Sequence, residues 1–458
     1  MRALNIFIFF TVICCSACQK NWLNAKPDSQ LVVLSTVSDY QTLMDNSQIY
    51  LNGSYASEMG GDNYYINPSY LATAVIQDID FYTWAMNGYG STHASDWTGA
   101  YEVIYGCNTA LDGLNKVAKT TENAALWNQV YGTALFFRAY YYYSLAEEYT
   151  KPYDSLAAPT NPGVPLRLEA DVTVSAGRGT IKQLYDQIFA DLVTATSLLP
   201  NSQQAFLTRP NKVSGYALLA RICLAVGNYA SAGNYADSAL QYQSTLLDYN
   251  SLPIPTSGTI LSMPPFAQNP EVIFETNISA FLLFPGYGAI DTALYASYAP
   301  NDLRKQIFFN ISVDSPLISF IGSYDGVISV FKFAAPAVDE MYLIRAECYA
   351  RGGNVAMAMS DLNSLLVKRW KTGSFVPYTA NSPDDALIQI LKERRKELVM
   401  RGTRWADLRR LNTDPRFAVT IKRVVNGQTY ILVPNSNAYA WPIPDDEILY
   451  SGIPQNPK

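Results

Sequence analysis

Segments rich in helix-forming and apolar residues, and poor in proline, alternate along the chain with segments rich in Pro, Gly, Asn and Ser. The first kind predicts two helices within 101–149 and further helices over about 180–198, 210–226, 229–245, 336–352, 354–370 and 383–402. Residues 246–335 differ, because β-branched and aromatic residues alternate there with turn-forming residues, which predicts loops and short strands. We therefore expect a mainly α fold with an irregular, loop-rich half.

An internal repeat is visible in two of the predicted helical regions. Each copy has a large residue, a small residue, a turn glycine and an alanine, at intervals of four, seven and five residues. The first copy is Tyr216, Ala220, Gly227 and Ala232, and the second is Tyr342, Ala346, Gly353 and Ala358. This pattern is typical of tetratricopeptide (TPR) helical hairpins. Because a stacked array needs about three units, we expect weaker copies at 101–149 and 180–198.

The N-terminal segment predicts export. Arg2 supplies a positive charge, and the apolar run 4–13 is too short for a spanning helix of about 20 residues. The small residues directly before Cys18 resemble a bacterial lipobox, which implies removal of residues 1–17 as a lipoprotein signal peptide and lipidation of Cys18. A secretory signal without lipid, or a redox pair of Cys15 with Cys18, is the alternative.

Composition narrows the classes of partner. The chain has 458 residues, a net charge of −6 and only 16% charged residues, so it lacks the basic footprint of a nucleic-acid-binding protein. A single histidine, His93, nearly excludes histidine metal clusters and multi-histidine catalysis. The 33 tyrosines favour recognition of neutral, hydroxyl-rich or peptide-like partners.

Several motifs follow the lipobox in a fixed order, and together they cover nearly the whole chain. They are Trp97-x-x-x-Tyr101-x-x-x-Tyr105-x-x-Asn108, Ala134-Leu135-Phe136-Phe137-Arg138-Ala139, Glu340-Met341-Tyr342-Leu343-Ile344-Arg345-Ala346-Glu347, Glu393-Arg394-Arg395-Lys396-Glu397-Leu398, the basic run 401–410 and Trp441-Pro442-Ile443-Pro444. In this order they resemble the SusD/RagB family of outer-membrane nutrient-binding lipoproteins.

The resemblance implies a single SusD-like domain over 18–458. Its TPR-type helices would occupy about 101–245 and 336–410, and its loop-rich, ligand-binding half about 40–100 and 246–335. It also implies a protein that is anchored by lipid in the outer membrane, is exposed at the cell surface and binds an oligosaccharide or a peptide. The protein would pass this ligand to a SusC-like TonB-dependent transporter. Catalytic residues, cofactors and metals are not implied.

Two aromatic segments are the candidate ligand-binding regions. An aromatic ring covers the flat apolar face of a sugar, while adjacent carboxylates and amides bind its hydroxyls. The first segment contributes Asp80, Tyr82, Trp84 and Tyr89, and the second contributes Tyr287 and Tyr295 in a glycine-containing loop. Packing in the core is the alternative for each ring, and we expect Trp97 to be a core residue.

Other functions remain as alternatives. A TPR-type adaptor would bind another protein, and a glycoside hydrolase would need a pair of carboxylates. The charged run 393–410 contains interleaved acidic and basic residues. We interpret it as an ion-pair network that holds the C-terminal helices, although an anion site is the alternative.

Overall fold

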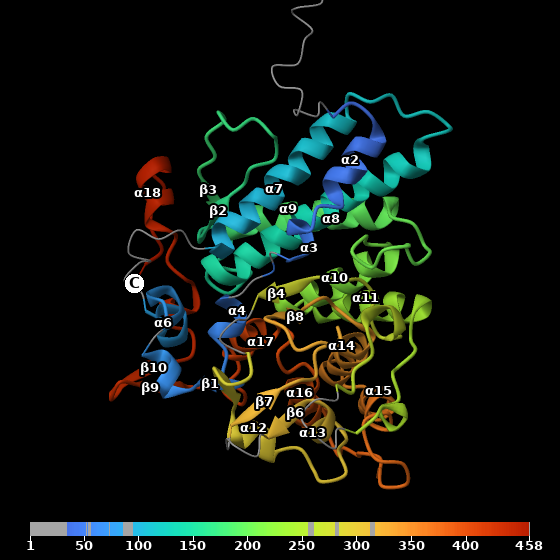
Figure 1. The fold of residues 1–458 in the computed structure, drawn as a ribbon, viewed down its shortest axis with the longest axis vertical. Coiled ribbons are helices and arrows are strands. Elements are labelled where there is room, and N and C mark those ends of the chain that lie inside the picture. The colour runs from blue at the N-terminus through green and yellow to red at the C-terminus, as the bar shows by residue number, and fades with distance from the viewer. Residues whose placement is uncertain are drawn as a thin grey trace, which may run out of the picture.

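A continuous series of packed helices forms the frame of the molecule (Figure 1). The computed structural model describes residues 34–51, 53, 56–72, 74–85, 95–254, 261–279, 284–311 and 317–457. Each helix of the frame packs on the next one: α7 (Ser95–Leu114), α8 (Ala124–Tyr149), α9 (Ile181–Leu198), α10 (Lys212–Ala225), α11 (Tyr229–Tyr242), α14 (Val338–Arg351), and then α15 (Val355–Leu366) and α16 (Pro383–Glu397). The predicted helical fold is confirmed. The expected signal peptide, Cys18 and Tyr89 lie outside the described residues.

The two repeat copies have matching geometry in α10–α11 and α14–α15. The turn glycines Gly227 and Gly353 have φ angles of +78° and +83°, which glycine adopts without steric cost. The next residue caps the second helix in both copies. Asn228 Oδ1 accepts the amide of Ser231, and Asn354 Oδ1 accepts that of Met357, both at 3.2 Å. The repeat alanines are fully buried where the helices meet: Ala220, Ala232, Ala346 and Ala358.

Helix α8 is buried on nearly all sides along its C-terminal two thirds and joins the frame to the irregular half. Its tyrosines place their hydroxyl groups on partners outside the helix. Tyr141 donates to the carbonyl of Ile49 at 2.6 Å, and Tyr142 donates to that of Arg167 at 2.7 Å. A tyrosine-rich helix can therefore lie in the core, because such hydroxyl groups have hydrogen-bond acceptors there.

The strands form two-stranded antiparallel sheets in the described part of the chain. The pairs are β1 (Tyr64–Ile66) with β5 (Gly288–Ile290), β2 (Pro162–Pro165) with β3 (Arg178–Thr180), β4 (Asn277–Ser279) with β8 (Phe331–Phe333), β6 (Phe309–Ile311) with β7 (Ile318–Phe320), and β9 (Ile421–Val425) with β10 (Gln428–Leu432). Three of these pairs lie wholly or partly within 246–335, where short strands were predicted. The β9–β10 hairpin was not predicted, although its Asn426-Gly427 turn, with both φ angles positive, is a strong hairpin signal.

Short helices occupy much of the N-terminal segment, which the sequence indicated only as loops. They are α2 (Val37–Met44), α3 (Gln48–Leu51), α4 (Ala56–Met59), α5 (Pro68–Leu71) and α6 (Ile76–Thr83). The remaining short helices are α12 (Thr292–Ala296), α13 (Arg304–Ile307), α17 (Arg404–Leu411) and α18 (Asp445–Ser451). Local caps explain some of them: Thr36 and Asp39 form a capping box at α2, and Asn67 caps α5. None of the described helices combines the length and the apolar character needed to cross a membrane.

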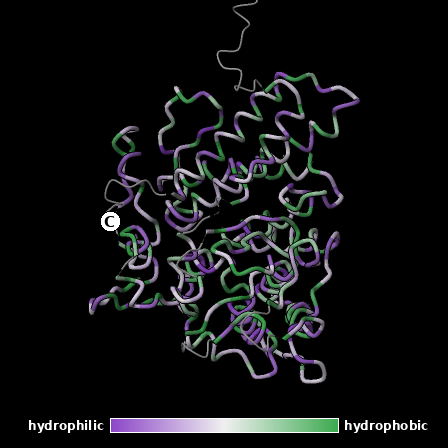
Figure 2. The backbone as a smooth tube through the Cα atoms, viewed as in Figure 1, coloured by the Kyte–Doolittle hydropathy of each residue, from purple (hydrophilic) through white to green (hydrophobic). Residues whose placement is uncertain are grey.

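The charged run 393–410 forms ion pairs inside the molecule, as predicted. Figure 2 shows hydrophilic stretches within the lower part of the molecule, where α16 and α17 lie. Arg394 pairs with Asp407 at 2.9 Å, and Arg410 pairs with Glu347 at 2.6 Å. These carboxylates and guanidinium groups neutralise one another, so the run joins α17 to two helices of the frame, α16 and α14.

A buried carboxyl on α4 gives a pH-dependent prediction. Glu58 accepts the amide of Gly402 at 2.8 Å through Oε2, while Oε1 has no partner among the described residues. Burial raises the pKa of Glu58 from its ordinary 4.5 to about 7. Its favourable contribution to stability is therefore fully present below pH 4.5 and is lost as the pH rises through about 7.

We compare the free energy of unfolding of Glu58→Gln with that of the native chain at two pH values. The difference, variant minus native, is expected to be about 1–3 kcal/mol greater at pH 8 than at pH 4.5. The glutamine cannot ionise, so it avoids the burial of a charge. Urea unfolding of both proteins at the two pH values measures this difference. Glu102→Gln, an exposed change on α7, is the control and should show no such dependence. A Glu58→Gln effect that is equal at both pH values contradicts the assignment.

Candidate functional site

Three half-buried rings lie together at the junction of α5 and β5, and we name Tyr70, Phe284 and Tyr287 the aromatic cluster. Backbone pairing sets their positions. The amide of Asn67 donates to the carbonyl of Tyr287 at 2.8 Å, just beyond the β1–β5 ladder. The amide of Tyr287 donates to the carbonyl of Phe284 at 3.0 Å, which closes the turn before β5. Two segments more than 200 residues apart therefore bring the rings to one place.

The rings of the cluster pack against one another but remain partly open to solvent. The centroids of Tyr70 and Tyr287 are 4.2 Å apart with an interplanar angle of 36°, and those of Phe284 and Tyr287 are 6.1 Å apart. Each ring therefore limits the motion of its neighbour. A ring whose orientation is already fixed loses little conformational entropy when it stacks on a ligand.

A cleft of about 420 Å³ lies between β1 and β9, which Figure 1 places close together. Its lining residues come from five parts of the chain: Asp62, Tyr64, Tyr65, Ile66, Pro68, Tyr82, Asp291, Arg395, Val419, Thr420, Ile421, Lys422, Arg423 and Val424. We name it the β1–β9 cleft. Pro68 begins α5, which carries Tyr70, and Ile66 pairs with Gly288, the neighbour of Tyr287. The segments that carry the aromatic cluster therefore adjoin the cleft, although none of its three rings is among the lining residues. The volume of the cleft suits a small-molecule ligand.

Ion pairs fix one wall of the cleft. Asp62 pairs with Arg404 at 2.5 Å and with Arg395 at 3.3 Å. Burial alone would raise the pKa of Asp62, but the two guanidinium groups outweigh it and lower the pKa to about 2. On the same wall, Asp291 Oδ1 accepts the amide of Leu294 at 2.8 Å and so caps α12. Asp62 is therefore not suited to proton donation.

Arg423 is buried among three aromatic rings at the inner side of the cleft. Its guanidinium carbon lies 3.9 Å from the ring centroid of Tyr82, 4.5 Å from that of Trp84 and 5.5 Å from that of Tyr64. The guanidinium donates to the carbonyls of Met59, Gly61 and Tyr82. The indole of Trp84 donates to the carbonyl of Gly60 at 3.0 Å. Cation–π contacts and carbonyl acceptors thus hold this cation in place.

In the first group of predicted site residues, Tyr82 therefore lines the cleft, whereas Trp84 and Asp80 do not. Tyr82 and Trp84 are only 4% and 5% exposed, and both pack on Arg423. Tyr82 lines the β1–β9 cleft, whereas Trp84 is outside its lining. Asp80 is half-buried on α6, where burial raises its pKa to about 6, and it does not line the cleft. The predicted core position of Trp97 is confirmed, since this residue is buried.

In the second group, Tyr287 belongs to the aromatic cluster, whereas Tyr295 does not. The ring of Tyr295 packs on Phe309 at 5.6 Å and lies under the ammonium group of Lys305 at 4.7 Å. The roles of all the sequence-predicted residues in ligand binding remain predictions.

Sequence reasoning missed other residues of this site: Tyr65, Tyr70, Arg395, Lys422 and Arg423. A local signal existed for some of them. The Asn67-Pro68 pair predicts a turn or helix start directly before Tyr70. The segment 421–425 contains three β-branched residues, Ile421, Val424 and Val425, and leads into Asn-Gly, which is typical of a hairpin. Its contact with the N-terminal segment has no local signal.

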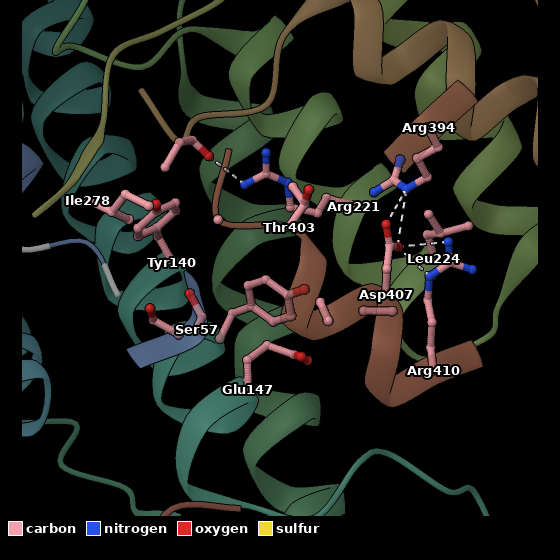
Figure 3. A pocket seen from close by; sticks show the side chains of 16 residues that line it. Ser57, Tyr140, Glu147, Arg221, Leu224, Ile278, Arg394, Thr403, Asp407 and Arg410 are labelled. Carbon is pink, nitrogen blue, oxygen red and sulfur yellow. Dashed lines mark hydrogen bonds and ion pairs between the residues drawn. The ribbon is translucent and has the colours of Figure 1, made fainter. Parts of the chain in front are cut away.

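A second hollow lies inside the frame, between α8, α10 and the α16–α17 region (Figure 3). Its volume is about 60 Å³, which is room for about two to four water molecules. Figure 3 shows Arg394 and Arg410 directed toward Asp407. Nη1 of Arg394 is buried without a partner among the described residues, so a water molecule is its expected acceptor. This cavity is too small for a sugar ring and belongs to the scaffold.

Three buried carboxylates have the spacing of a metal site but already have cationic partners. Oxygen atoms of Glu271, Asp339 and Glu397 lie within 4.8 Å of one another. Arg369 binds Glu271 and Glu397, both at 2.7 Å, and Arg401 binds Asp339 at 3.1 Å. The arginines supply the positive charge that a metal would otherwise provide, so this cluster fits an ion-pair network better than a metal centre.

Two family models match the chain. Residues 21–224 match a SusD-like family described as starch-binding and associating with the outer membrane, and residues 339–458 match the SusD family. Together the two matches cover more than two thirds of the sequence. None of the curated proteins compared with the chain matches it.

Several solved structures are similar to the chain over nearly its whole length. A SusD-like carbohydrate binding protein from Bacteroides vulgatus is 20% identical with a TM-score of 0.69, and the match covers 92% of this chain and 97% of that one. A SusD superfamily protein from Bacteroides thetaiotaomicron is 19% identical with a TM-score of 0.70, covering 92% and 100%. Surface glycan-binding protein A from Bacteroides uniformis is 18% identical with a TM-score of 0.69, covering 92% and 99%. At these identities the similarity establishes a shared fold.

Proposed function

Because the chain belongs to the SusD family, we propose that it is a lipid-anchored protein of the bacterial cell surface that binds an oligosaccharide. In this proposal it delivers the bound oligosaccharide to a TonB-dependent transporter in the outer membrane. The helical frame holds the binding surface, and the irregular segments at β1, β5 and β9 form it.

The observation that carries the proposal is the aromatic cluster at the border of a polar cleft. Sugar rings have flat faces of C–H groups that stack on aromatic rings, and hydroxyl groups that need hydrogen-bond partners. The cluster offers Tyr70 and Tyr287 for stacking, and the cleft offers the polar ends of Tyr65, Lys422 and Arg395. Both kinds of contact are within one site, so an oligosaccharide can use them together.

We propose binding without catalysis at this site. Hydrolysis of a glycosidic bond needs a carboxylic acid that is protonated near neutral pH. Asp62, with its pKa lowered to about 2, cannot supply that proton. Asp291 already caps α12, and Asp80 does not line the cleft. The groups in the cleft are thus suited to holding a ligand.

The anchor is proposed from the N-terminal sequence, and the transporter partner from membership of the SusD family. A lipid on Cys18 would hold the mature chain at the membrane, since the described helices include no membrane span. In cells given radioactive palmitate, we expect the native protein to carry label and to sediment with outer membranes, and Cys18→Ala to lose at least nine tenths of the label.

Tagged native protein, purified in detergent, is expected to bring a transporter of the outer membrane with it.

Cys15→Ala is the matched control, because it changes a cysteine inside the expected signal peptide. This variant should be labelled like the native protein. Equal labelling of Cys18→Ala and the native protein, or no labelling of either, contradicts the proposed anchor.

A further inference from the structure

Three cationic side chains line the β1–β9 cleft: Arg395, Lys422 and Arg423. They differ in whether a carboxylate pairs with them. Arg395 pairs with Asp62, as described above. Lys422 is exposed on β9, and its side chain forms no hydrogen bond or ion pair in the described part of the chain. Arg423 donates only to backbone carbonyls and has no carboxylate partner among the described residues.

The acidic groups of the cleft do not balance these cations. Asp62 is shared by Arg395 and by Arg404, which lies outside the lining. Asp291 is engaged by the backbone at the start of α12. Three cations thus face two carboxylates in the lining, so the cleft carries a net positive charge, and the ammonium group of Lys422 has no ion-pair partner in the described part of the chain. Walls of low dielectric constant strengthen the resulting positive potential relative to an open surface.

We propose that the β1–β9 cleft binds an anionic substituent of the ligand, so that the protein selects acidic oligosaccharides. This inference rests on the proposed function and specifies its substrate class. A carboxylate of a uronic acid and a sulfate ester offer the same chemistry, namely a compact anion with several hydrogen-bond acceptors. The anion would lie near Lys422, while a neighbouring sugar ring would stack on Tyr287 and Tyr70.

An oligosaccharide fits these observations better than an acidic peptide. The cleft with its cations adjoins the segments that carry half-buried rings, and a sugar ring can carry its charged substituent directly beside the flat face that stacks on an aromatic ring. An extended peptide would add a strand to a sheet edge, and such binding relies on backbone hydrogen bonds more than on charge. The peptide is therefore the competing outcome of the experiment.

Titration calorimetry of the full mature protein in detergent micelles tests the inference. The probes are an oligogalacturonate, its methyl ester, a sulfated heparin oligosaccharide, maltohexaose and a hexaglutamate peptide. We expect at least one acidic oligosaccharide to bind at least about tenfold more tightly than the neutral probes at 50 mM salt, and to weaken strongly at 500 mM. The methyl ester keeps the sugar skeleton and removes the charge, so it isolates the effect of the anion.

Lys422→Gln should weaken binding of that acidic probe about three- to tenfold, which is typical of losing one charge-assisted contact. Lys116→Gln removes an exposed lysine at the end of α7 and should have no effect. Because Lys422 is exposed, thermal unfolding of the variant should match that of the native protein.

Three other binding results would overturn the inference, the proposed function or both. Equal, salt-independent binding of neutral and acidic oligosaccharides overturns the inference and leaves the proposed function intact. Tighter binding of hexaglutamate than of any oligosaccharide overturns both in favour of a peptide ligand. Binding of none of the oligosaccharides also overturns both. The sulfated and carboxylated probes distinguish the two sources of the anion.

Discussion

Replacing Arg304 with methionine is expected to lower the free energy of unfolding by about 3–5 kcal/mol. The guanidinium of Arg304 is fully buried and binds three carboxylates. It donates to Asp302 at 2.7 Å, to Glu393 at 2.6 Å and to Glu397 at 2.8 Å. Methionine fills much of the same volume but leaves buried negative charge without its main partner. The loss should be larger at pH 8 than at pH 5, because protonation relieves that charge at lower pH.

Urea unfolding of the native and Arg304→Met proteins at both pH values measures this effect. Arg416→Met is the matched control, because the side chain of Arg416 is 45% exposed and pairs with Asp414 and Asp384 at the surface. Exposed pairs contribute less than about 1 kcal/mol, so the control should lose little stability. Similar small losses in both variants would show that the buried network does not hold the C-terminal helices.

The same network shows what local sequence can and cannot predict. The interleaved charges in 393–410 correctly predicted ion pairs involving this segment. Arg304 and Glu271, however, come from the irregular half of the chain. Only the folded structure brings Arg304 to Glu393 and Glu397, and Glu271 to Arg369. The repeat was predictable in more detail, because a turn glycine and a capping asparagine act within a few residues of their own position.

The proposed ligand-binding surface was harder to predict for a related reason. The aromatic composition of the N-terminal segment indicated rings, but the position of each ring depends on Arg423, which is more than 330 residues away from Tyr82 and Trp84. That cation draws both rings inward. Tyr70 lies among fewer aromatic neighbours in the sequence, yet the pairing of β1 with β5 brings it against Tyr287. Long-range pairing therefore decides which rings remain partly exposed.

Replacing Tyr70 and Tyr287 together with alanine is expected to weaken oligosaccharide binding about ten- to a hundredfold, or about 1.4–2.8 kcal/mol. Both rings would be lost from the stacking surface, while the backbone hydrogen bonds between Asn67 and the β5 turn do not involve the substituted side chains. The rings are only half-buried, so the fold should be retained. Tyr450→Ala is the control, since Tyr450 is 84% exposed on α18 and lies outside the cleft lining.

The central claim is that a rigid helical frame presents the aromatic cluster and its neighbouring cleft to a glycan. Its most direct measurement is the Kd of one oligosaccharide for three proteins, namely the native chain, Tyr70→Ala/Tyr287→Ala and Tyr450→Ala, with Tm recorded for each. We expect the double variant alone to lose affinity, with a Tm close to the native value. An unchanged Kd in a folded double variant would place glycan binding elsewhere and contradict the account.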